Sequence, residues 1–216
     1  MAVYSLLERN TKAIFTLRNA CWNASVTNEN KVFTVINHEK KEVVSLSNDN
    51  YFSYVKKISF TNDSGTAHAI NDSIIVAGGV TSNGDTINAK VQLVHNERIT
   101  NLARMKTLRF DHCSALYDDM LYLIGGFNGH HRLSSCEVLD TRIKPYTKSK
   151  QTVEIASLME ARSSAACVMV PNHGIVVTGG FDEQGDALSS VEIYLPPDNA
   201  WFNLPPMINL ENIFCP

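Results

Sequence analysis

The sequence lacks the features that mark several large classes of protein. None of its apolar stretches approaches the roughly 20 residues that span a bilayer, and Glu8, Arg9 and Lys12 interrupt the N-terminal region too early for a secretory leader. We therefore expect a cytoplasmic protein without a membrane partner. The 19 basic and 22 acidic residues nearly balance, and no run of Lys or Arg could follow a row of phosphates, so nucleic acid is a poor candidate partner.

The sequence also lacks the residue patterns of a metal or catalytic site. Its five cysteines are odd in number and widely spaced with no CxxC pair, so we expect free thiols. No two of the seven histidines have metal-binding spacing, and His112 and Cys113, as neighbours in a strand, would point to opposite faces. No pair of carboxylates is placed for acid–base work. We expect no cofactor, no metal and no enzymatic activity.

What the sequence does have is a glycine pair that recurs at the end of three strand-like stretches. The pairs are separated by 125−78=47 and 179−125=54 residues, and an apolar residue, Ile58, Met105 or Met159, stands twenty positions before each first glycine. A period near fifty with a constant internal frame is typical of small β-sheets stacked side by side. The pairs are Gly78 and Gly79, Gly125 and Gly126, and Gly179 and Gly180.

The clearest unit predicts four antiparallel strands. Its first two, over 112–116 and 120–124, form a tight hairpin, and the others are expected over 135–139 and 154–158. Apolar residues run almost continuously through the second strand, which indicates burial on both faces. A large apolar residue in the fourth strand, at Ile99, Val153 or Trp201, is expected to plug the space between sheets.

The frame divides the chain into units. We expect a degenerate unit over 1–57, repeats over 58–104, 105–158 and 159–206, and the start of a further repeat over 207–216. In the degenerate unit, 32–36 and 42–46 are expected to be the last two strands. Residues 1–30 could hold its first two strands or, in competition, a short helix over 3–7.

The order Met, Arg, His, apolar-Tyr-apolar-Ile-Gly-Gly, apolar-Glu-apolar, Trp and Leu-Pro-Pro-Met resembles the kelch repeat, most closely that of BTB-kelch proteins. The resemblance covers about 58–207 and implies an all-β fold, a kelch-type β-propeller with one four-stranded blade per repeat. In such proteins the propeller commonly captures substrates for a Cullin-3 ubiquitin ligase, whereas other members bind actin, and a few kelch-fold proteins are enzymes.

This sequence departs from that pattern, because no BTB or BACK domain precedes the repeats and only about four blades can be counted. An open arc of blades would expose an apolar face at each end. We therefore expect a partial propeller from a truncated gene product, a small closed ring, or association with a second arc or a longer kelch protein.

The resemblance also implies where a partner would bind. It places an Arg and the loop after each glycine pair near one mouth of the central channel. The planar guanidinium of arginine can bind a carboxylate of an acidic peptide through two hydrogen bonds. A structural role for both arginines, tying blades together through neighbouring carbonyls, is the alternative. The implied partner-binding residues are Arg109, Arg162, Asn128, His130, His131, Arg132, Asp182, Glu183 and Gln184. The sequence thus favours a non-catalytic protein-interaction module with a protein partner, an acidic peptide or actin.

Overall fold

The computed structural model describes residues 24–26, 33–37, 42–46, 52–53, 62–70, 73–81, 85–95, 98–142 and 151–208. Every regular element in these ranges is a β-strand. Within them there is also no helix long and apolar enough to cross a membrane. The predicted all-β class is confirmed.

The strands form four four-stranded antiparallel sheets, which we number in chain order. The first sheet contains β1 (Ala24–Val26), β2 (Phe33–Asn37), β3 (Glu42–Leu46) and β4 (Phe52–Ser53). The second contains β6 (Thr66–Ile70), β7 (Ser73–Ala77), β9 (Lys90–His95) and β10 (Arg98–Arg104). Beside it β5 (Asn62–Asp63) pairs with β8 (Val80–Thr81).

The third and fourth sheets repeat this plan. The third contains β11 (Cys113–Tyr117), β12 (Met120–Ile124), β13 (Cys136–Asp140) and β14 (Val153–Ile155). The fourth contains β15 (Ala166–Val170), β16 (Gly174–Thr178), β17 (Val191–Leu195) and β18 (Ala200–Leu204). In each, strands adjacent in the sequence are adjacent in the sheet.

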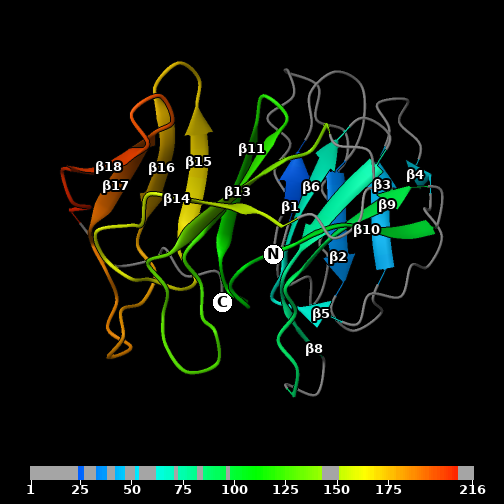
Figure 1. Ribbon diagram of the computed structural model, residues 1–216, viewed down its shortest axis with the longest axis horizontal. Helices are drawn as coiled ribbons and strands as arrows, with labels where there is room; N and C mark the ends of the chain where they lie inside the picture. The colour runs from blue at the N-terminus through cyan, green and yellow to red at the C-terminus, as the bar shows by residue number, and fades with distance from the viewer. Residues whose placement is uncertain are drawn as a thin grey trace.

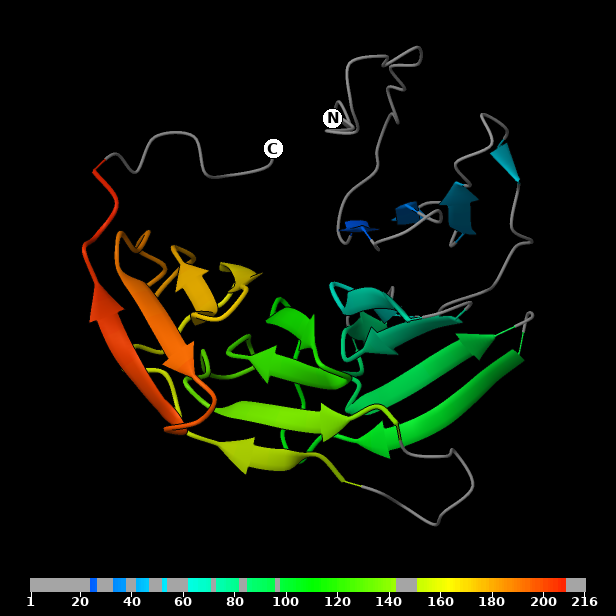
Figure 2. The same ribbon diagram turned by 90° about the horizontal axis from the view of Figure 1, so that it is seen from above.

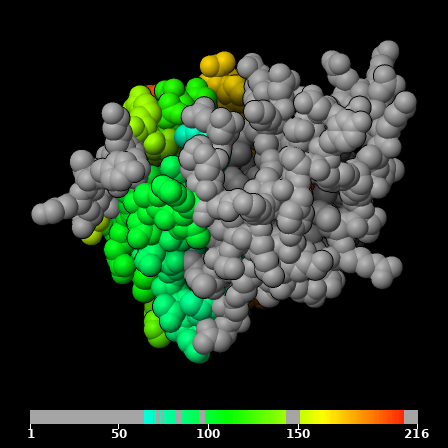
Figure 3. All heavy atoms as spheres, turned by 90° about the vertical axis from the view of Figure 1, so that its right-hand side faces the viewer, coloured from blue at the N-terminus to red at the C-terminus, as the bar shows by residue number. Residues whose placement is uncertain are grey.

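The sheets follow one another around an arc, with their first strands on the inside and their last strands on the outside (Figures 1 and 2). The first strands β6, β11 and β15 contact one another in turn, and β1 contacts β6. Figure 3 views the molecule from the side of the second sheet, whose residues form the teal and green surface. This arrangement is the partial propeller of about four blades that the repeat frame predicts.

The apolar core lies between sheets, not within one. Leu121 and Leu123 of β12 pack toward the second sheet, whereas Tyr122 and Ile124 of the same strand pack toward the fourth. Because side chains alternate along a strand, each central strand contributes to two cores. All four side chains are at most 7% exposed, which confirms the predicted burial on both faces.

The fourth sheet shows what happens where the described arc ends. Its β15 and β18 carry exposed apolar side chains, Val168 at 58% and Phe202 at 45%, on the face opposite the one that packs on the third sheet. On the packed face Trp201 is buried at 5% and donates its indole N–H to the carbonyl of Ala156 at 2.8 Å. The same sheet thus has one face typical of a core and one that faces solvent.

Backbone hydrogen bonds tie the second sheet to the third and the third to the fourth. The N–H of Asp111 donates to Ser64 O at 2.9 Å, and the N–H of Ser164 donates to Asp111 O at 2.7 Å. A second pair runs from the N–H of Gly79 to Arg109 O and from the N–H of Gly126 to Arg162 O, at 3.0 and 2.8 Å. Equivalent hydrogen bonds thus recur between successive sheets, as the sequence repeat predicts.

Two expectations about individual positions were wrong. β2 and β3 are the middle strands of the first sheet, since β4 follows them. The helix over 3–7, the alternative to strands in that region, lies outside the described residues. Of the proposed plugs only Trp201 is buried, whereas Ile99 and Val153 are 42% and 61% exposed. The strand register explains this difference. Trp201 pairs with buried Tyr194, on the face that packs on the preceding sheet. Val153 pairs with Val138 on the opposite face, so its chain neighbour Thr152 is the buried residue.

The apolar residue before the arginine also differs from the expected frame. Met105 is buried, but Met159 is 60% exposed and Leu158 is the buried residue of its repeat. The N–H groups of Met105, Leu158 and Met207 donate to Ala89 O, Ser134 O and Ser189 O at equivalent points of successive sheets. Each of these three side chains lies against the first glycine of the preceding pair. From the buried residue to the arginine there are 109−105=4 and 162−158=4 positions, whereas to the next first glycine there are 125−105=20 and 179−158=21.

Two histidines, buried His112 and partly buried His68, lie between the second and third sheets. His112 shares a hydrogen bond with Thr66 Oγ1 at 3.0 Å through Nε2, and His68 Nε2 shares one with Ser114 Oγ at 2.7 Å. Burial lowers the pKa of His68 to about 4. Burial, together with the charge of Arg109, lowers the pKa of His112 to about 3. Both imidazoles are therefore neutral in the folded protein at neutral pH.

We expect the protein to lose stability as the pH falls from 6.5 to 5. Both folded pKa values lie below the unfolded value of 6.5, so the unfolded chain binds more protons in this window. The loss should be about 1.4 kcal/mol per pH unit for each histidine. Urea unfolding at several pH values measures it; His68→Gln should reduce the slope, exposed His130→Gln should not, and a flat profile for the parent would contradict the prediction.

Candidate functional site

The two arginines expected to bind a partner are buried and hydrogen-bonded inside the protein. Arg109 is 0% exposed, and its Nη1 donates to Gly125 O at 2.7 Å and to Ser135 O at 2.8 Å. Its Nη2 donates to Glu137 Oε1 at 2.6 Å. The guanidinium thus joins the segment before β11 to the ends of β12 and β13.

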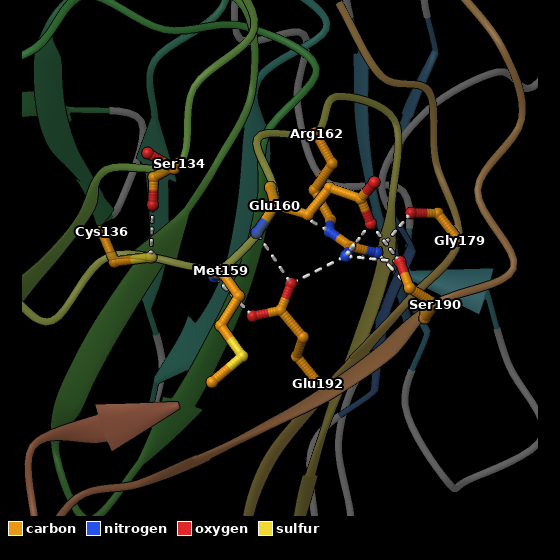
Figure 4. A network of polar contacts seen from close by, with 8 residues as sticks. All are labelled: Ser134, Cys136, Met159, Glu160, Arg162, Gly179, Ser190 and Glu192. Carbon is orange, nitrogen blue, oxygen red and sulfur yellow. Dashed lines mark hydrogen bonds and ion pairs between the residues drawn. The ribbon is translucent and has the colours of Figure 1, made fainter. Parts of the chain in front are cut away.

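Arg162 repeats the arrangement one sheet later. Its Nη1 donates to Gly179 O at 2.9 Å and Ser190 O at 3.2 Å, and its Nη2 donates to Glu192 Oε1 at 2.7 Å (Figure 4). The Glu192 carboxylate also accepts the N–H groups of Met159 and Glu160. The Arg162 and Glu192 side chains are each 1% exposed, so the ion pair is closed to solvent.

The carboxylate that faces Arg109 is equally enclosed. Glu137 accepts hydrogen bonds from Thr152 Oγ1 and from the N–H groups of Lys106 and Thr107. Burial alone would raise the pKa of Glu137, but the bond from Thr152, the Arg109 charge and the Lys106 N–H outweigh burial and hold that pKa below its usual value. The carboxylate stays ionised as the partner of Arg109.

These contacts give Arg109 and Arg162 the structural role that the sequence left open beside partner binding. Neither guanidinium presents a donor to solvent, and both bind carbonyls and a carboxylate of their own sheet. An acidic peptide could therefore not reach either one without opening the sheet. The expectation of an acidic peptide rested on these two arginines and has no structural support from them.

The loops after the glycine pairs are the exposed part of the predicted site. Phe127 pairs with Phe110 and with Arg132, and Phe181 pairs with Ser163 and with Ala187, so each loop is held beside the segment that follows its arginine. We call residues 127–133 and 181–187 together the rim loops. His130, His131, Glu183 and Gln184 are exposed on them, while Asn128, Arg132 and Asp182 are partly buried.

Side chains from one rim loop hold the other in place. Glu183 accepts a hydrogen bond from the Arg132 N–H at 2.7 Å and pairs with His131 Nδ1 at 2.8 Å. These contacts, with that of the Arg132 N–H first, lower the pKa of Glu183. Arg132 Nε donates to Ser163 Oγ at 3.1 Å, and its guanidinium lies over the Phe127 ring at 5.8 Å. The rim loops of neighbouring sheets thus form one surface.

Each rim loop is also held by one side chain of its own. Asn128 Oδ1 accepts the N–H groups of His130 and His131, and Asp182 Oδ1 accepts those of Gln184 and Asp186. Such local bonds are typical of Asn and Asp in turns. Asn128 and Asp182 therefore position the loops, and the exposed side chains of His130 and Gln184 have no such local role.

The residues that hold the two arginines were not predicted from the sequence. Glu137 and Glu192 are at most 1% exposed, although each stands between apolar residues in its strand. A charged residue inside a buried strand needs a partner of opposite charge, and an arginine recurs in the same frame. The apolar-Glu-apolar pattern could therefore have predicted both ion pairs.

Two stretches of the chain, residues 108–144 and 162–208, match the kelch motif. They contain β11, β12 and β13 and the whole fourth sheet, with both buried arginines, so these two stretches carry kelch motifs. None of the curated proteins compared with the chain matches it.

Solved structures show the same fold. One, described as "Structure of YjhT", is similar with a TM-score of 0.70 and 13% identity over 86% of this chain and 65% of that one. Another, a fungal alcohol oxidase of the AA5 family in complex with copper, is similar with a TM-score of 0.59 and 13% identity over 85% and 53%. The chain thus spans less than two thirds of either protein, and at this identity the likeness concerns the fold alone. In the part of the chain that the structure describes, no three His, Cys, Asp or Glu side chains are grouped to hold a metal ion.

Proposed function

We propose that this protein is a non-catalytic protein-interaction module of the cytoplasm that binds its partner through the rim loops. The observation that carries the proposal is the joining of two polar loops from successive kelch repeats into one exposed surface by Glu183, His131 and Arg132. Kelch repeats generally mediate contacts between proteins, and loops on a rigid scaffold are where such contacts concentrate.

The chemistry of the surface suggests the kind of partner. The exposed groups include the carboxylates of Glu183 and Asp186 and the hydrogen-bonding side chains of His130 and Gln184, while Arg109 and Arg162 are buried and Arg132 is partly buried against Phe127. A segment with at least one basic side chain and several hydrogen-bonding groups complements this surface better than an acidic one. In finer terms, we propose that this partner is captured as substrate-recognition propellers of Cullin-3 ubiquitin ligases capture theirs.

We expect the double variant His130→Ala, Gln184→Ala to weaken partner binding at least tenfold with little change in stability. Both side chains are exposed, and truncating central contact residues of an interface typically costs more than about 1 kcal/mol each. Partners captured by the tagged parent would be identified by mass spectrometry with chemical cross-linking, and the affinity of each then measured with purified protein.

The matched control is His173→Ala, which removes an exposed histidine from the β15–β16 turn at the other end of the sheet. It should bind like the parent. Cross-links confined to that end, or equal loss of binding in the control, would place the interface elsewhere and overturn the proposal. Ubiquitylation of the captured partner, measured with and without the chain, tests the finer proposal separately.

A further inference from the structure

Two cysteines from neighbouring sheets meet at the inner edge of the arc. Cys113 begins β11 and Cys167 lies in β15, and both belong to the apolar core between the third and fourth sheets. Cys167 Sγ donates to Ser114 O at 3.1 Å, next to Cys113 in the chain. Cys113 faces the same core from β11, the strand that contacts β15, and its thiol donates to Ile124 O at 3.8 Å. The neighbouring Cys167 side chain, followed by burial, raises the pKa of Cys113 well above the ordinary value. The two cysteines therefore face each other across the boundary between sheets.

The third described cysteine cannot take part in the same way. Cys136 shares the core, but β12 lies between its strand and that of Cys113, because both residues pair with Ile124 from opposite sides. Two strand spacings amount to roughly 10 Å, beyond the roughly 7 Å limit between the Cα atoms of a disulfide. The Cys136 thiol donates instead to Ser134 O at 3.4 Å.

We propose that Cys113 and Cys167 form a reversible disulfide that ties the innermost strands of the third and fourth sheets together when a peroxide is present. Cys167 is partly exposed, whereas Cys113 is 8% exposed. The oxidant therefore reaches Cys167 first, and Cys113 faces the product sulfur from the contacting strand β11. Both are free thiols in the structure, which is the reduced state of this pair.

The reaction balances in two steps. The Cys167 thiolate attacks one oxygen of hydrogen peroxide, the O–O bond breaks, and with one proton a sulfenic acid and one water form. The sulfur of Cys113 then attacks the Cys167 sulfur, the S–O bond breaks, and the Cys113 proton leaves with the hydroxyl group as a second water. The two thiols are oxidised and the peroxide is reduced. A dithiol reductant reverses the bond by thiol–disulfide exchange.

The placement of the bond gives it a defined effect. It would close a loop of 167−113=54 residues between two sheets that are otherwise joined by packing and a few hydrogen bonds. A cross-link of this kind restricts the unfolded chain and raises the unfolding midpoint. Because the Cys113 thiol is held protonated, bond formation should be faster at alkaline than at neutral pH.

The test is a peroxide titration of the whole protein, followed by blocking of the remaining thiols and peptide mass spectrometry without reduction. We expect a peptide pair joined at Cys113 and Cys167, lighter than the two thiol peptides by two hydrogen atoms, together with a higher urea midpoint that dithiothreitol returns to its starting value. Cys136→Ser should behave like the parent.

Two variants keep the proposal open to refutation. Cys113→Ser should yield no cross-link and should leave a sulfenic acid on Cys167 that dimedone traps, and Cys167→Ser should yield neither product at these positions. If the parent instead accumulates trapped sulfenic acid at Cys167 without the cross-linked peptide, or pairs Cys167 with other cysteines, the proposal is wrong.

Discussion

Arg109→Ala is expected to lower the free energy of unfolding by about 3–5 kcal/mol, because it leaves the Glu137 carboxylate buried without its cation. Both side chains of the pair are 0% exposed, so water cannot replace the guanidinium without opening the sheet. The change also removes donors from Gly125 O and Ser135 O. Urea unfolding at pH 7 followed by circular dichroism measures the loss.

The matched control breaks an exposed ion pair in the same region. Lys106 Nζ and Glu154 are 2.8 Å apart, but their side chains are 39% and 60% exposed, so Glu154→Ala should change stability by less than about 1 kcal/mol. The double variant Arg109→Ala, Glu137→Ala should cost less than the sum of the single changes, because it leaves no unpaired charge. Equal losses for Arg109→Ala and Glu154→Ala would show that the buried pair has no special role.

Gly125→Ala is expected to cost about 3 kcal/mol, from two causes that act together. The backbone of Gly125 has φ +60°, which a residue with a side chain adopts only at a cost. An added Cβ would also lie 2.7 Å from the carbonyl oxygen of Arg162 in the next sheet. That carbonyl accepts the hydrogen bond of Gly126, so the clash also disturbs the junction between sheets.

Gly185→Ala separates the two causes. Gly185 has φ +89°, but nothing lies within 4 Å of the position that its Cβ would occupy. Its substitution should therefore cost only the backbone term, about 1 kcal/mol. A thermal unfolding scan of both variants beside the parent makes the comparison, and similar midpoints for the two would mean that the contact with the next sheet is unimportant.

Much of the fold could be predicted because its pattern is local. The strand over 120–124 is the observed β12, and the strands expected over 112–116 and 135–139 are β11 and β13, each displaced by one residue. Continuous apolar residues in β12 indicated burial on both faces, which the structure confirms. The first sheet was placed less well, because its unit has no glycine pair to set the frame.

The predictions from the sequence were wrong where they depended on which face of a sheet a residue occupies. Met159 and Leu158 are adjacent, and the spacing to Gly179 favoured Met159, but the sheet buries Leu158. A shift of one residue along an extended chain moves a side chain to the opposite face. The same reason explains why Val153 is exposed while its neighbour Thr152 binds Glu137.

The position of the rim loops could be predicted from the sequence, but the contacts between them could not. The sequence pointed to the loops after the glycine pairs, but not to Glu183 as the residue that joins them, because His131 and Glu183 are separated by 183−131=52 residues. Contacts between repeats depend on how one sheet is rotated against the next.

The sequence by itself determined that the chain folds as successive four-stranded sheets with kelch repeats, because glycine pairs, alternation and turn residues act within a few positions of one another. Only the tertiary structure decided that Arg109 and Arg162 are buried cross-ties and not a binding surface, and that Cys113 and Cys167 meet. Burial and pairing of side chains from different sheets follow from the packing of those sheets, and no local pattern in the chain specifies that packing.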